Sequence, residues 1–169
     1  MFSPIHSSRA LAGLVVVLLG LAAGPVAARE AADIEIALGA SNTTDREFTP
    51  VASVAWLPEL MQMHNAVLRA DAGVVYVDGR GDVVGRDLGD SVVVGHVGLR
   101  YERTDSGLTL GAGVGGQAGE TDALSGDVQF ITTGGWRWER FSLLVRHISN
   151  ASLNSPNDGE TMLVAGWRF

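Results

Sequence analysis

Apolar and polar residues alternate along most of this chain, in segments of about ten residues that are separated by polar turns. Successive side chains of a β-strand point to opposite faces, so this alternation predicts strands with one apolar and one polar face. The segment 91–103 is typical, because its large apolar and its charged side chains lie on opposite faces. The apolar face holds Val93, Val97, Leu99 and Tyr101, and the polar face holds His96, Arg100 and Glu102.

Eight such segments follow one another after residue 32. Their approximate limits are 33–40, 48–56, 65–78, 91–103, 108–117, 128–138, 141–146 and 163–169. Eight is an even number and the smallest strand count that closes a membrane barrel. The pattern therefore predicts an all-β fold, an eight-stranded antiparallel transmembrane β-barrel over residues 29–169.

Soluble sandwiches and lipocalin-type barrels also alternate, so the character of the polar face has to separate them from a membrane barrel. A small soluble barrel fills its interior with apolar side chains, whereas here Arg, Asp, Glu and His gather on one face of nearly every segment. Such charges fit the lumen of a membrane barrel, where they can pair. Leu163, Trp167 and Phe169 share the apolar face of the last segment and resemble the C-terminal strand signal of bacterial outer-membrane proteins. We therefore expect the chain to lie in the bacterial outer membrane, in contact with its lipids.

Residues 1–28 have the pattern of a secretory signal peptide. Arg9 precedes an apolar stretch from Leu11 to Ala23, and the small residues 26–28 offer a cleavage site after Ala28. The apolar stretch is shorter than the roughly 20 residues that a spanning helix needs. We expect the mature chain to begin near Arg29 and to leave the cytoplasm.

The charged residues exclude some functions. All twelve basic residues are arginine, they form no basic run, and the formal net charge is −7, so nucleic-acid binding is not expected. The chain has no cysteine, and its four histidines show no zinc-ligand spacing, so neither a metal nor a cofactor is expected.

The connections between segments divide into two kinds. With a periplasmic N-terminus, the outer loops are 41–47, 79–90, 118–126 and 150–159, which are long and rich in Gly, Asp, Asn and Ser. Two of the three periplasmic turns are short, and the third, predicted over 58–64, is longer than usual for such a barrel.

Two polar residues continue the apolar face of the seventh segment. Phe141, Leu143 and Val145 share that face, so by parity His147 and Ser149 also point to the lipid. Alternate residues on one face of a strand lie about 6.5 Å apart at Cα, which lets an imidazole meet a hydroxyl. Histidine can accept the proton of a serine that attacks a carbonyl carbon. The pair therefore predicts acyl transfer or hydrolysis at the rim of the barrel.

Acyl transfer by Ser and His needs two further kinds of group. An acid orients the imidazole, and Glu160 is the nearest candidate, with Asp158 as the fallback. Hydrogen-bond donors stabilise the oxyanion, and Asn157 or the backbone amides after Ser149 can supply them.

The string His147-Ile148-Ser149-Asn150-Ala151, followed by Asn157-Asp158-Gly159-Glu160, closely resembles the signature of the PagL family of outer-membrane lipid A 3-O-deacylases. The resemblance implies an eight-stranded barrel that hydrolyses the ester-linked acyl chain at the 3-position of lipid A, the lipid anchor of lipopolysaccharide. It makes Ser149 the nucleophile, His147 the base and Asn157 an oxyanion or structural donor. Asn150 and the motif glycine, Gly159, are supporting residues.

This chain departs from the family pattern at the acid. In the family the acid lies one residue further from the motif glycine, where this chain has Thr161. Strand parity repeats the difference, because it places Thr161 outside and Glu160 inside. A β-bulge at the start of the last strand would turn Glu160 outward, and otherwise the dyad works with a weaker orienting group.

Two other functions fit the same residues. A small barrel without enzymatic activity could serve as a membrane anchor or adhesin, and the same Ser and His chemistry could act on phospholipids. The sequence does not fix the oligomeric state, and a homodimer stays open.

Overall fold

A single closed sheet makes up the part of the chain that the computed structural model describes, residues 33–43, 47–81 and 85–169. The predicted signal peptide, residues 1–28, lies outside the described residues. The strands are β1 (Ile34–Asn42), β2 (Phe48–Trp56), β3 (Glu59–Met63), β4 (Ala66–Val77), β5 (Val92–Arg103), β6 (Leu108–Ala118), β7 (Val128–Trp138), β8 (Phe141–Ser149) and β9 (Glu160–Arg168). Within these residues no helix is long and apolar enough to cross a membrane.

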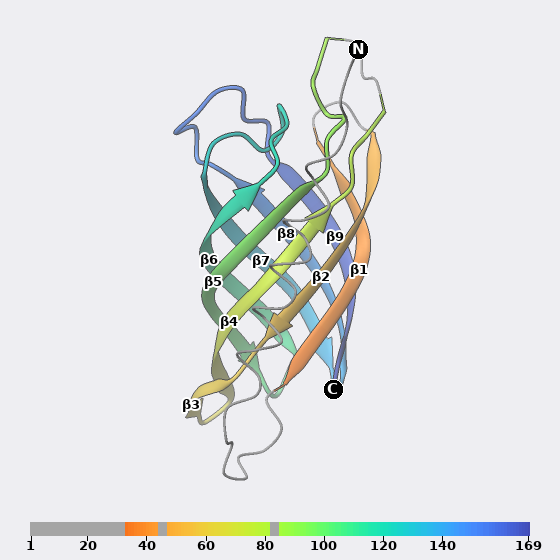
Figure 1. The fold of residues 1–169 in the computed structure, drawn as a ribbon. Coiled ribbons are helices and arrows are strands. Elements are labelled where there is room, and N and C mark those ends of the chain that lie inside the picture. Colours follow the sequence, from red (N-terminus) through yellow and green to blue (C-terminus); the bar gives the residue numbers. More distant parts are fainter. Residues whose placement is uncertain (1–32, 44–46, 82–84) are drawn as a thin grey trace, which may run out of the picture. The chain divides into compact units, whose positions relative to one another are not determined.

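The barrel closes where its first strand meets its last. β1 pairs antiparallel with β9 over the whole register from Glu35↔Arg168 to Asn42↔Thr161. The other strands follow in chain order, and β2 and β3 both pair with β4 (Figure 1). Leu57 and Pro58 separate β2 from β3, so these two elements together occupy one strand position of the barrel wall. The predicted eight-stranded antiparallel barrel is confirmed.

The turn predicted over 58–64 is wrong. Residues 59–63 form β3, and the turn consists of His64 and Asn65. Four of the five β3 residues are exposed and none is buried, because β3 extends past the packed interior of the barrel. Without a buried face the segment has no alternation, which is the signal that identifies the other strands.

The two ends of the barrel differ. The connections β1–β2, β4–β5, β6–β7 and β8–β9 lie at one end, here called the loop end. The short connections β3–β4, β5–β6 and β7–β8 lie at the other, the turn end, together with the C-terminus (Figure 1).

The lumen holds a network of charged residues toward the turn end and mostly apolar side chains toward the loop end, where Arg80 and Glu160 form a separate buried ion pair. On β5 the inward side chains run from Val92 and Val94 near the loop end to Arg100 and Glu102 near the turn end, and all four are buried. The sequence predicted a polar lumen, which describes the turn end better than the loop end, where valines also point inward. Runs such as 92–94 are apolar on both faces, so alternation did not show that Val92 and Val94 point into the lumen.

Arginine–carboxylate pairs fill the charged part of the lumen. Arg100 donates to Glu35 Oε1 at 2.6 Å and to Asp71 Oδ2 at 2.8 and 3.0 Å. Closer to the turn end, Arg168 donates twice to Glu102, which also accepts from Arg69. These pairs come from β1, β4, β5 and β9, so they cross-link opposite walls of the barrel.

The outer surface of the barrel is apolar. Leu38, Val97 and Leu163 are each more than half exposed, although they lie in the middle of strands. Aromatic side chains are exposed at the turn end, as expected for a membrane–water interface. They are Trp56, Trp136, Trp138, Phe141, Trp167 and Phe169.

We predict that Arg100→Met destabilises the barrel by about 3–5 kcal/mol, because it removes the buried guanidinium that pairs with both Glu35 and Asp71. Urea unfolding in lipid vesicles, followed by the gel mobility of folded and unfolded chain, measures the effect. Arg103→Met is the matched control, because Arg103 pairs with Asp105 on the exposed turn-end surface. Equal unfolding midpoints for the two variants would contradict this account of the lumen.

Candidate active site

The loop end of β8 carries two polar residues on the outer face of the barrel. Phe141, Leu143 and Val145 are exposed on this face, and His147 and Ser149 follow on it, each half-buried. The intervening side chains, from Ser142 to Ile148, are buried in the lumen. The structure thus places His147 and Ser149 where parity predicted them, at the edge of the apolar surface.

The imidazole of His147 contacts two residues at the start of the next strand. Its Nδ1 lies 2.9 Å from Thr161 Oγ1, and His147 and Thr161 are paired in the β8–β9 register. Its other edge packs on Gly159, where an added Cβ would lie 2.7 Å from Cε1 and 3.1 Å from Nε2. Gly159 also has a φ of +70°, which an L-residue rarely adopts. Glycine is therefore required here both for space and for conformation.

Asn150 fixes the chain immediately after Ser149. Its side chain is fully buried, and its Nδ2 donates to Ser125 O at 2.8 Å and to Asn154 O at 3.2 Å. Its backbone N–H donates to Asn157 Oδ1 at 3.2 Å. Asn150 thus joins two loop-end connections and holds Asn157 beside the backbone of Ser149.

The structure does not bring the Glu160 carboxylate to His147. Glu160 is buried and points into the lumen, where Arg80 donates to its two oxygens at 2.5 and 2.8 Å and Ser41 Oγ donates to Oε2. β9 begins in regular register with β8, so no bulge turns Glu160 outward. Asp158, the fallback acid, is ion-paired with Arg86.

The connections at the loop end are joined to one another. Asp158 N and Gly159 N donate to Asp122 O and Ala123 O in the β6–β7 connection, and Asp122 N donates to Asp87 O in the β4–β5 connection. Leu88, Ala123 and Leu124 are buried beneath them. The start of β9 is therefore held in place from outside the β8–β9 hairpin.

The β4–β5 connection is also fixed at its base. The hydroxyl of Tyr76, the hydroxyl of Ser91 and the backbone N–H of Gly79 all donate to the Asp78 carboxylate, at 2.8, 3.1 and 3.1 Å. The bonds from Tyr76 and Ser91 lower the pKa of Asp78, which keeps this side chain ionised.

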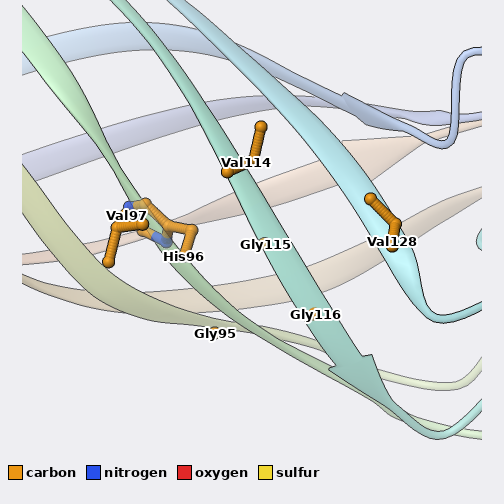
Figure 2. A pocket seen from close by; sticks show the side chains of 7 residues that line it. All are labelled: Gly95, His96, Val97, Val114, Gly115, Gly116 and Val128. Atoms are coloured by element: carbon orange, nitrogen blue, oxygen red, sulfur yellow. The ribbon is translucent and has the colours of Figure 1, made fainter.

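A shallow apolar groove lies on the outer surface over β5, β6 and β7, and β7 pairs with β8, the strand that carries Ser149. Val97, Val114 and Val128 border it, and the glycines Gly95 and Gly116 leave it open (Figure 2). Phe130, the register partner of both Val114 and Ser149, lies between this groove and the site. In the described part of the chain, no three His, Asp or Glu side chains come together as metal ligands.

Two residues of this region were not predicted as site residues. Thr161 stands at the position of the acid in the family pattern. The β8–β9 register pairs it with His147, so its hydroxyl reaches the imidazole. Arg80 gave no usable signal, because its partner Glu160 lies 80 residues further along the chain.

A closed eight-stranded barrel with an apolar outer surface and a Ser and His pair at its rim defines an outer-membrane protein with the groups of an ester hydrolase. The family model described as lipid A 3-O-deacylase (PagL) matches residues 33–169. The chain belongs to the PagL family of lipid A 3-O-deacylases, as its sequence motif indicated. The predicted outer-membrane location and enzyme class are confirmed with it.

The fold is also found in a solved structure, the crystal structure of the outer-membrane enzyme PagL. That chain is 23% identical, and the match covers 82% of this chain and 99% of that chain with a TM-score of 0.52. No curated protein matches the chain.

Proposed function

We propose that this chain removes the 3-position acyl chain of lipid A with Ser149 as nucleophile and His147 as general base, at the outer-leaflet rim of the barrel. The observation that carries the proposal is the placement of His147 and Ser149 on the outer face of β8, where the apolar surface ends. The ester bonds of a lipid lie at this depth of a leaflet. A substrate can therefore reach the site by lateral diffusion, without entering the lumen.

The contacts of His147 support its role as base. Nδ1 is engaged with Thr161 Oγ1, so Nε2 is the nitrogen that remains to accept a proton from Ser149. Ser149 Oγ attacks the ester carbonyl carbon while Nε2 takes its proton. When the carbon–oxygen bond to the sugar breaks, His147 returns the proton to the departing 3-oxygen. Water, activated by His147, then releases the fatty acid from Ser149.

Asn157 is the proposed oxyanion donor. Its Oδ1 accepts from the Asn150 N–H, which fixes the orientation of the amide and leaves Nδ2 as the group that can donate. A preformed donor of this kind stabilises the charge of the tetrahedral intermediate. Asn150 and Gly159 support the site, the first by holding Asn157 and the second by admitting the imidazole. All of these residues belong to one chain, so the chemistry does not require a homodimer.

We expect Ser149→Ala to lower deacylation at least about a thousandfold, because the nucleophile is lost while the barrel is unchanged. Mass spectrometry of lipid A from cells that express each form measures the result. Ser106→Ala, in the exposed β5–β6 connection, is the control and is expected to behave as wild type. Loss of the acyl chain in cells with folded Ser149→Ala would refute the proposal. Release of fatty acid from pure phospholipid vesicles, with lipid A unchanged, would indicate a phospholipase instead.

We expect Gly159→Ala to lower kcat by about a hundredfold, because the new Cβ would displace the imidazole, and displacements of about 1 Å have effects of this size. Gly85→Ala is the matched control, because Gly85 has a similar φ of +81° but no heavy atom within 4 Å of the added Cβ. Both variants carry similar backbone strain, so the contacts of the added Cβ separate them, the tightest of which is with His147 Cε1 at 2.7 Å. Initial rates on purified lipid A in detergent measure the difference, and equal rates would remove Gly159 from the site.

A further inference from the structure

We propose that the hydroxyl of Thr161, rather than a carboxylate, is the group that positions His147 for catalysis. This inference rests on the proposed function and assigns the third member of the same site. Thr161 acts through His147 and does not touch the reacting atoms, so it is a positioning residue.

The sheet register places the two side chains together. His147 and Thr161 are direct partners on β8 and β9, and both point out of the barrel. Cross-strand partners have Cβ atoms about 5 Å apart, which matches the observed bond of 2.9 Å between Nδ1 and Oγ1. A β-branched side chain on a strand has few rotamers, so the Thr161 hydroxyl is held in place before substrate binds.

The bond is compatible with the imidazole tautomer that catalysis needs. When Nδ1–H donates to Thr161 Oγ1, Nε2 carries the lone pair that Ser149 needs. The opposite arrangement, in which the hydroxyl donates to Nδ1, would put the proton on Nε2 and block the reaction. A hydroxyl can therefore hold the ring in its orientation and accept the Nδ1 proton of the active tautomer, although it carries no charge to stabilise the imidazolium.

Among the residues that the structure describes, the ionisable groups near His147 are turned away or paired. On β9 and its connection, Glu160 is bound to Arg80 in the lumen and Asp158 is paired with Arg86. On β8 the neighbouring Arg146 is buried in the lumen, and the partner of His147 on β7 is the uncharged Thr132. Thr161 is therefore the polar side chain that bonds the ring.

Glu160 has a different role in this arrangement. Its carboxylate binds Arg80 of the β4–β5 connection and Ser41 of β1, so it fixes the first residue of β9 to two other parts of the barrel. Because successive residues of a strand point to opposite faces, anchoring Glu160 inward aims Thr161 outward at His147.

The first test removes only the hydroxyl. Thr161→Val keeps the shape of the side chain on a lipid-exposed strand, and we expect kcat on lipid A to fall about 10- to 100-fold with KM unchanged. Thr161→Ser restores the hydroxyl and is expected to recover most of the rate. Wild-type kcat in folded Thr161→Val would overturn the inference.

The second test compares pH profiles. A carboxylate at position 161 favours the protonated imidazole, and the reaction needs the neutral form. Thr161→Glu should therefore remain active while the acidic limb of kcat/KM moves up by about 1–3 pH units. Glu160→Gln should lower the stability of the folded barrel and leave this limb in place. A shift of the limb in Glu160→Gln, with none in Thr161→Glu, would overturn the inference in favour of Glu160.

Ser149→Ala separates this inference from the proposed function. If folded Ser149→Ala retains activity, the proposed site itself fails. If Ser149→Ala is inactive and Thr161→Val keeps the wild-type rate and pH profile, only the role of Thr161 fails.

Discussion

The pairing of β1 with β9 is the interaction on which the rest of the structure depends. In lipid no water can satisfy backbone N–H and C=O groups, so a sheet that spans a membrane must have no free edge. The register from Glu35↔Arg168 to Asn42↔Thr161 meets this requirement. The closed sheet also gives each strand of the barrel, apart from the short β3, one face toward lipid and one toward a narrow lumen. The position of each side chain, including those of the site, follows from that division.

The division explains why chemistry and stabilisation use opposite faces. In the lumen, Arg100 pairs with Glu35 and Asp71, and Glu160 pairs with Arg80. His147 and Ser149 lie on the outside, where a lipid can reach them. A carboxylate at Glu160 is thus committed to holding strands together, and a neutral hydroxyl is the group that stands beside the imidazole.

Alternation predicted the strands, their outward residues and the faces of His147 and Ser149, because those properties depend on parity alone. It also placed Glu160 inside and Thr161 outside. It missed β3, where the residues have no buried face, and the apolar part of the lumen, where valines follow one another. The Arg80–Glu160 pair could not be predicted, because it joins two residues that only the closed barrel brings together. A local pattern contains no information on such a contact.

The anchor of Glu160 links catalysis to barrel assembly. Glu160, the first residue of β9, accepts a hydrogen bond from Ser41 of β1, the neighbouring strand. It also accepts one from Arg80 of the β4–β5 connection. Both contacts hold Glu160 inward, and strand parity then points Thr161 outward toward His147. The proposed hydrolytic centre is therefore complete only in the closed barrel, because each of these contacts joins segments that barrel closure brings together.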